Sequence, residues 1–125
     1  MGEDRQLLIL VVEDQFLIRE LMRLALADAG FATAEAQSAT EAVDLMRRIA
    51  IDGLVTDINL GVGPSGWDLA RFARELAVTM PVVYVTGGSA GQWRSHGVPN
   101  SALLEKPFAA GDVVGSMHRL LETRH

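Results

Sequence analysis

Two short apolar segments of the chain run directly into carboxylates. Residues 7–12 (LLILVV) precede Glu13 and Asp14, and residues 53–56 (GLVT) precede Asp57. Three carboxylates that converge repel one another strongly, so either one of them stays protonated or a cation lies among them. An all-oxygen set of ligands suits Mg²⁺, which keeps several waters and takes only one or two carboxylates directly.

Two further apolar segments end at residues that can bind an oxyanion. Residues 81–85 precede Thr86, and residues 102–104 lead to Lys106. A hydroxyl and an ammonium beside a metal site form a cradle for a tetrahedral oxyanion such as a phosphoryl group. Asp57 can then act as a nucleophile on phosphorus, with Mg²⁺ and Lys106 neutralising charge as it develops.

These residues meet only if the apolar segments belong to one parallel sheet. The segments are short and apolar throughout, which is typical of strands covered on both faces. Helical patterns alternate with them, and this alternation implies a parallel sheet with helices on both faces. With strand order 2-1-3-4-5, the first and third strands are neighbours at the switch point, where the three carboxylates converge. We expect helices near 15–29, 38–50, 66–77 and 110–122, and a weaker strand over 31–36.

Two of the expected elements have notable side chains. In the first helix, Phe16, Leu17, Leu21, Leu24 and Ala25 fall on one helical stripe. The segment 87–101 (GGSAGQWRSHGVPNS) is a poor helix, because its glycines and proline oppose that structure. Within it, Trp93 is a candidate for partner contact or for simple packing. Trp67 is expected to pack at a helix start.

Composition limits the class of protein. A chain of 125 residues, 49% of them hydrophobic, fits one folded domain over residues 1–125. The net charge of −5, without a basic block, argues against direct nucleic-acid or anionic-membrane binding. The absence of cysteine excludes disulfide and zinc-thiolate chemistry. The first apolar run is too short for a signal peptide or a membrane span, so we expect a cytoplasmic protein.

Each candidate residue also has an ordinary structural interpretation. Asp14 is well placed to cap the next helix, Asp57 and Lys106 are common turn residues, and Thr86 is an ordinary strand residue. The joint placement of compatible chemistry at the ends of several strands favours the functional interpretation. The three histidines (96, 118 and 125) are scattered and form no triad-like pattern, and the loop GVGPSG lacks the ending of a nucleotide-binding phosphate loop.

Taken together, the motifs VVEDQ, LVTDINL, VYVTGG and LEKPF resemble those of the receiver domain of two-component response regulators. The resemblance covers essentially the whole chain. It implies a flavodoxin-like, doubly wound (βα)5 fold with a five-stranded parallel sheet. It also implies a stand-alone phosphoacceptor of a phosphorelay, which receives a phosphoryl group from a histidine kinase or histidine phosphotransfer protein and then switches contacts with a downstream protein target.

The resemblance also assigns roles to individual residues. Asp57 would be the phosphoacceptor, and Asp14 would bind Mg²⁺ directly, with Glu13 acting through water. Asn59 would supply a backbone carbonyl to the metal. Thr86 would be the switch hydroxyl and Lys106 the phosphate-binding lysine, followed by a cis Lys106–Pro107 peptide. The only reactions expected are phosphorylation and dephosphorylation of the chain itself.

The sequence departs from the usual receiver pattern at three places. Leu103 stands where the family usually has the aromatic residue that couples to the threonine, and Tyr84 lies two residues before Thr86. The loop after Asp57 lacks the common Met-Pro, and its sequence LGVGPSGWDLA predicts a longer loop than usual. The strand PVVYVTGG is partly similar to that of a subgroup of stand-alone receivers with an FATG-like fourth strand. We hypothesise that phosphorylation draws Thr86 inward and reorganises residues 87–100 without an aromatic lever.

Three other functions fit parts of the pattern. A phosphatase-type, metal-dependent hydrolase would need a second aspartate two residues after the nucleophile, where this chain has Asn59. A receiver excised from a larger hybrid kinase or regulator would share every motif. A receiver used only as a binding module would not need the intact set of acidic residues, threonine and lysine.

Overall fold

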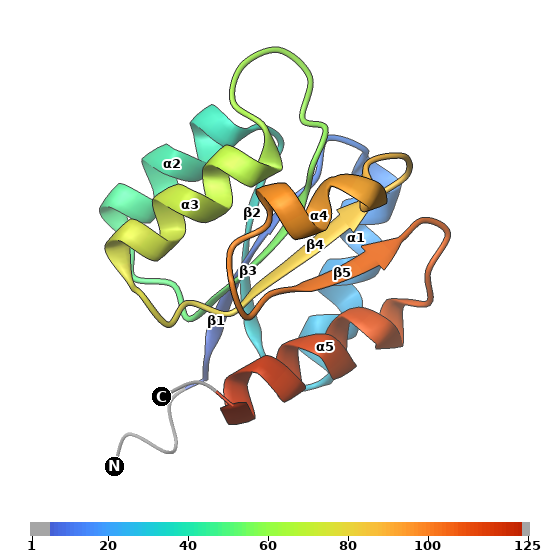
Figure 1. The fold of residues 1–125 in the computed structure, drawn as a ribbon. Coiled ribbons are helices and arrows are strands. Elements are labelled where there is room, and N and C mark those ends of the chain that lie inside the picture. The colour runs from blue at the N-terminus through green and yellow to red at the C-terminus, as the bar shows by residue number, and fades with distance from the viewer. Residues whose placement is uncertain (1–5, 124–125) are drawn as a thin grey trace.

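The computed structural model describes residues 6–123, so His125 and both ends of the expected 1–125 domain lie outside the described residues. Strands and helices alternate along the chain (Figure 1). In chain order the elements are β1 (Leu8–Val12), α1 (Phe16–Asp28), β2 (Ala32–Ala36), α2 (Ala39–Arg48), β3 (Gly53–Asp57), α3 (Gly66–Leu76), β4 (Val82–Thr86), the 3₁₀ turn η2 (Ala90–Gln92), α4 (Trp93–His96), β5 (Ala102–Glu105) and α5 (Ala110–Thr123).

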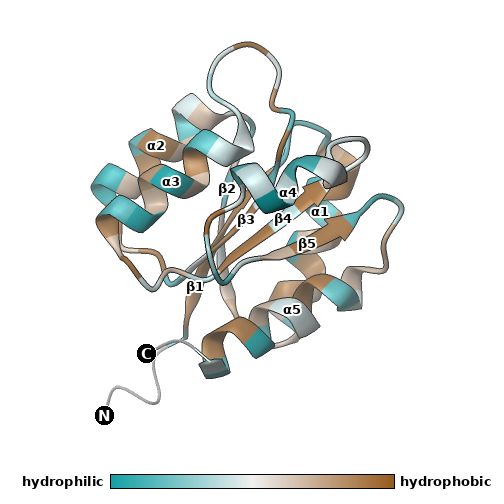
Figure 2. Cartoon of the chain, in the orientation of Figure 1, coloured by the Kyte–Doolittle hydropathy of each residue, from teal (hydrophilic) through white to brown (hydrophobic). Residues whose placement is uncertain are grey.

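The five strands form one parallel sheet in the order β2-β1-β3-β4-β5, as predicted. Helices α2 and α3 cover one face of the sheet, and α1 and α5 cover the other (Figure 1). The central strands β1, β3 and β4 are apolar for most of their length (Figure 2) and are buried almost throughout. The sheet therefore separates two apolar layers, and Asp57 and Thr86 lie at the ends of its central strands.

Serine caps begin the two helices on the α2–α3 face. The Ser38 side chain accepts a hydrogen bond from the backbone N–H of Glu41 at the start of α2. At α3, Ser65 and Asp68 form a reciprocal capping box, with each side chain accepting from the other residue's N–H. Such caps satisfy N–H groups that a helix start leaves unpaired. The second cap fixes where the long loop after β3 ends and α3 begins.

Helix α1 buries a different face from the one that carries its largest apolar side chains. Its buried residues are Arg19, Met22 and Leu26. The stripe noted in the sequence instead lies largely exposed to solvent, at Phe16, Leu17, Leu21 and Leu24. The helix begins after Gln15 without a side-chain cap, so the alternative role of Asp14 as a helix cap is wrong.

The segment between β4 and β5 contains little helix, as its glycines predict. Helix α4 is only four residues long and follows the short turn η2. Trp93 is half-buried against the core, and its indole N–H donates to Ser101 Oγ at 3.0 Å, which supports packing over partner contact. Trp67 is buried at the start of α3, as expected. Within residues 6–123, no helix is both long and apolar enough to cross a membrane.

Candidate functional site

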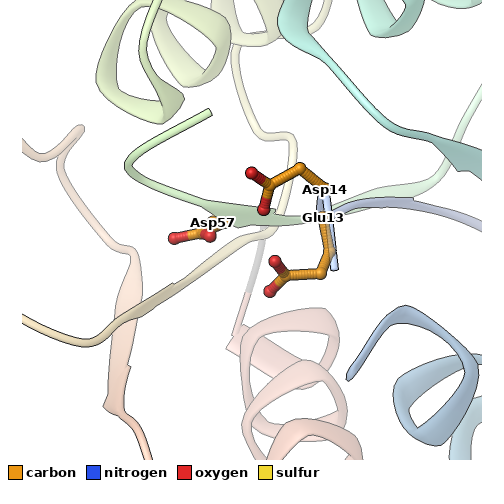
Figure 3. A group of neighbouring side chains, drawn as sticks. All are labelled: Glu13, Asp14 and Asp57. Carbon is orange, nitrogen blue, oxygen red and sulfur yellow. The ribbon is translucent and has the colours of Figure 1, made fainter. Parts of the chain in front are cut away.

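The three carboxylates predicted to converge do so at one end of the sheet. Glu13 and Asp14 follow β1, and Asp57 ends β3, the strand beside it (Figure 3). Each residue offers a carboxylate oxygen, and these oxygens lie within 4.8 Å of one another. Glu13 is fully buried and Asp57 nearly so, whereas Asp14 is exposed. The cluster is therefore open to solvent on the side of Asp14.

Lys106 supplies the positive charge of the site. Its ammonium Nζ lies 3.0 Å from Glu13 Oε1 and donates a hydrogen bond to Asp57 Oδ2 at 3.2 Å. The Lys106 backbone N–H donates to the Thr86 carbonyl at 2.7 Å, which holds the end of β5 beside that of β4. Burial disfavours the charged form of Lys106, yet contact with Glu13 and Asp57 raises its pKa overall. The Lys106–Pro107 peptide is cis, as predicted.

Glu13 lies in an unusual electrostatic environment for a carboxylate. Burial, opposed by Lys106 and reinforced by the negative charge of Asp57, raises the pKa of Glu13 to about 7. Its Oε2 accepts a hydrogen bond from the Gln15 backbone N–H at 3.2 Å. Its Oε1 is buried beside the Lys106 ammonium, but none of the residues 6–123 donates a well-aligned hydrogen bond to it.

The composition of the cluster fits a hard divalent cation. Every candidate ligand atom is an oxygen, one buried carboxylate oxygen accepts no well-aligned hydrogen bond from the described residues, and one carboxylate opens to solvent. Oxygen ligands with room for retained water are what Mg²⁺ prefers. The structure thus confirms an acidic cluster that can bind a metal.

Thr86 and Asn59 lie on the two loops beside Asp57. Thr86 is buried, and its Oγ1 accepts hydrogen bonds from the backbone N–H groups of Gly88 and Ser89 at 3.2 and 2.9 Å. The Asn59 N–H donates to Asp57 Oδ1 at 3.3 Å, and its side-chain amide donates to Ser89 Oγ at 3.2 Å. Asn59 therefore joins the loop after β3 to the loop after β4, next to the acidic cluster, and Thr86 holds the start of the second loop.

Two residues that support the site escaped the sequence analysis. The Gly66 N–H donates to the Ile58 carbonyl at 2.8 Å, and a Cβ at Gly66 would clash with the carbonyl of Asp57. Only glycine allows α3 to begin so close to the end of β3. Arg19, on the buried face of α1, donates from Nη1 to the Glu13 carbonyl at 2.8 Å. The sequence gives no sign of this second contact, because an arginine on a helix is normally solvated.

The fold and the acidic site together define a doubly wound α/β protein with a carboxylate cluster at its switch point. The sequence profile of the response regulator receiver domain matches residues 9–117. The chain therefore belongs to the response regulator receiver family, as the motifs indicated.

Individual relatives agree with this assignment. Response regulator MprA of Mycobacterium sp. strain KMS is 30% identical over 115 residues, which cover 90% of this chain and 50% of that protein. The chain thus spans about half the length of the curated relatives it matches. A response regulator receiver protein of Sinorhizobium medicae WSM419 is 38% identical, with a TM-score of 0.94 over 97% of this chain and 98% of that one. The receiver domain of NtrX from Brucella abortus is 31% identical, with a TM-score of 0.80 over 92% and 98% of the two chains.

Proposed function

We propose that this receiver is a phosphoacceptor in which Asp57 takes a phosphoryl group in a reaction that depends on Mg²⁺. The observation that carries the proposal is the contact between Lys106 Nζ and Asp57 Oδ2 at 3.2 Å, beside the Glu13–Asp14–Asp57 cluster. This contact places an ammonium at the carboxylate that would carry the phosphoryl group. A buried nucleophile flanked by a cation and a metal site is the arrangement that phosphoryl transfer requires.

The transfer forms one bond and breaks another. A carboxylate oxygen of Asp57 attacks phosphorus, and the bond from phosphorus to the donor breaks, with its electron pair staying on the donor. For a phosphohistidine donor, that bond is the P–N bond and the leaving group is the imidazole. Lys106 neutralises charge on the transferred group, and the buried Thr86 hydroxyl is the candidate to bind one of its oxygens.

The metal would be held by the carboxylate of Asp14, which is open to solvent, together with Asp57 and the backbone carbonyl of Asn59. Glu13 would act through a water. Bound Mg²⁺ would supply positive charge opposite Lys106 and offset the repulsion between Asp57 and the incoming phosphoryl oxygens. Gain and loss of this phosphoryl group are the only reactions we assign to the chain.

The surface beside the site supports a protein as the phosphoryl donor. Exposed apolar side chains of α1 border a groove that reaches the site at Lys106. A donor with an apolar helical face would bury this surface while presenting its phosphohistidine to Asp57. We therefore infer a histidine kinase or histidine phosphotransfer protein as the partner, in the cytoplasm, with a downstream protein as the target. The groove is lined by Ile18, Leu21, Lys106, Pro107, Phe108 and Ala110.

Two other functions are less well supported. A phosphatase-type hydrolase would need a second acid where Asn59 lies, and the Asn59 amide instead donates to Ser89. A binding module without phosphorylation would leave the buried Glu13, Asp57 and Lys106 arrangement without a use. Whether the receiver acts alone or as part of a longer regulator is a separate question, which the size of the native protein in cell extract would answer.

The direct test is phosphorylation of the purified chain by acetyl phosphate, followed by intact mass. The wild type should gain the mass of one phosphoryl group when Mg²⁺ is present and none when it is chelated. Asp57→Asn should gain nothing under either condition. Asp44→Asn, which alters an exposed aspartate on α2, should behave as the wild type does.

The outcomes separate the competing functions. A phosphoryl gain that persists in Asp57→Asn would place the acceptor elsewhere and overturn the proposal. Mg²⁺ binding without a phosphoryl gain would mean that the small donor fails, and the protein donor would then be tested. A chain that neither binds Mg²⁺ nor gains a phosphoryl group would favour the function of a binding module.

A further inference from the structure

A buried arginine lies directly beneath the loop that carries two of the three carboxylates. Arg19 is only 9% exposed and shares the inward face of α1 with Met22 and Leu26. Burial of a charged side chain is unfavourable unless its charge is paired and its donors are used. The groups that the Arg19 side chain contacts therefore indicate its role.

The guanidinium contacts three residues near the end of β1. Its Nη1 donates to the backbone carbonyl of Glu13 at 2.8 Å in a buried hydrogen bond. Its Nε lies 3.4 Å from the Glu35 carboxylate on β2, and its Cζ lies 5.5 Å from the centre of the Phe16 ring. The planar, multi-donor guanidinium can make these contacts together, whereas a lysine ammonium has no equivalent fork.

The hydrogen bond fixes the backbone from which both acidic side chains project. Glu13 is also held on the β2 side, because its N–H donates to the Ala36 carbonyl at 3.1 Å. With its N–H and its carbonyl both bound, the backbone on either side of Glu13 has little freedom. The side chains of Glu13 and Asp14 are thereby directed toward Asp57.

We propose that Arg19 is a positioning residue for divalent-cation binding by this cluster. It holds the Glu13 carbonyl, and so keeps Glu13 and Asp14 in the arrangement that accepts Mg²⁺. The proposal rests on the Mg²⁺ site of the proposed function, and no part of it requires Arg19 to touch the metal or the phosphoryl group.

The sign of the effect distinguishes positioning from simple electrostatics. Arg19 is a positive charge near a site for a cation, so by charge alone its removal should tighten Mg²⁺ binding. If Arg19 positions the ligands, its removal should weaken binding instead. Partners that orient metal ligands typically change affinity by about tenfold or more when they are lost.

The experiment is a calorimetric Mg²⁺ titration of the unphosphorylated chain, without any phosphoryl donor. Arg19→Met should bind Mg²⁺ about tenfold more weakly than wild type, and Arg19→Lys, which keeps the charge but not the fork of donors, should bind with an affinity between those two. Arg23→Met is the matched control, because Arg23 lies one turn further along α1 and pairs with Glu20 and Glu35 but not with Glu13. Its Mg²⁺ affinity should stay at or slightly above that of wild type. Thermal melts in the absence of Mg²⁺ would identify any variant that is not folded.

Three results would overturn the proposal. Arg19→Met that binds Mg²⁺ as tightly as wild type, or more tightly, contradicts positioning. If Arg19→Met does not fold, an Arg19→Lys variant that binds Mg²⁺ with wild-type affinity contradicts positioning. A wild-type chain that binds no Mg²⁺ would refute the metal site of the proposed function, and this proposal with it.

Discussion

The hydroxyl of Tyr84, on β4, accepts a 3.0 Å hydrogen bond from the backbone N–H of Val98, fourteen residues later in the chain. Tyr84 is fully buried, pairs in register with Leu103 on β5, and packs its ring against Trp67 at 4.7 Å between centroids. The chain thus has its aromatic side chain on β4, opposite the β5 position where receivers usually carry one. Through this bond, the strand that ends at Thr86 holds the segment that follows α4.

Removal of the Tyr84 hydroxyl should loosen that segment. In Tyr84→Phe, the buried N–H of Val98 loses its acceptor, and we expect a loss of about 1–3 kcal/mol in the free energy of unfolding. Urea denaturation would measure it. Ser95→Ala, which removes a hydroxyl with exposed hydrogen bonds in the same segment, should change stability by less than about 0.5 kcal/mol. Equal stability of Tyr84→Phe and wild type would show that the bond contributes nothing.

The phenol of Tyr84 should lose its proton at a higher pH than the phenol of an ordinary tyrosine. Burial raises the pKa of Tyr84 above its usual value of 10.0, against opposing effects of the Val98 N–H, Arg71 and Arg74. The unfolded chain therefore loses the phenolic proton at a lower pH than the folded chain. Stability is retained below pH 10 and falls as the pH rises from there through the higher pKa of the folded state.

Ultraviolet absorbance of tyrosinate measures this directly, because Tyr84 is the only tyrosine in the chain. The native protein should titrate at higher pH than the same protein in concentrated urea. Coincident midpoints would contradict the buried, hydrogen-bonded hydroxyl.

Occupation of Asp57 by a phosphoryl mimic should alter residues 87–100. Thr86 Oγ1 accepts hydrogen bonds from Gly88 and Ser89, and movement of that oxygen toward a phosphoryl group would break both. Backbone NMR with beryllofluoride and Mg²⁺ should therefore show shifts across 87–100, with the indole N–H of Trp93 as a second reporter. Asp57→Asn should show none of them. Unchanged signals throughout 87–100 in the wild type would exclude this switch.

Substitution on the exposed face of α1 should separate the two kinds of donor. Leu21 is 59% exposed and lines the groove that ends at Lys106. Leu21→Ser should slow transfer from a phosphohistidine protein about tenfold, because an apolar contact worth about 1.4 kcal/mol in the complex is lost. Phosphorylation by acetyl phosphate should be unaffected, since a small donor needs no docking surface.

Leu76→Ser on α3 provides the control, because Leu76 is similarly exposed but lies on the opposite face of the sheet. Its rates with both donors should match those of wild type. If the protein donor phosphorylates Leu21→Ser at the wild-type rate, α1 is not part of the docking surface.

The sequence was sufficient to predict the parallel sheet and the part of the site that is formed by the residues at the strand ends. Apolar runs marked the strands, alternation gave the parallel sheet, and the residues after each run predicted the meeting of Glu13, Asp14 and Asp57. This worked because parallel strands must deliver their carboxyl ends to one edge. The amino-acid types at those ends then restricted the chemistry.

The sequence did not predict which face of α1 is buried or what lies beneath the site. The periodicity of α1 contains two stripes, and the one with Arg19, Met22 and Leu26 packs on the sheet. Arg19 is buried because the Glu13 carbonyl and Glu35 satisfy it, and such partners arise only from tertiary structure. The bond from Val98 to Tyr84 is likewise set by the path of an irregular segment, for which no sequence period exists.

The contact between Lys106 and Asp57 also has a consequence for biosynthesis. The two residues are 49 positions apart, Asp57 at the end of β3 and Lys106 directly after β5, and β4 separates these strands in the sheet. During synthesis from the N-terminus, the carboxylates of β1 and β3 leave the ribosome long before the lysine that neutralises them. The acidic cluster therefore lacks this positive charge until β5 has been synthesised and has paired with β4. Because the proposed phosphoryl transfer to Asp57 uses Lys106, we expect a chain that has not yet added β5 to be unable to accept a phosphoryl group.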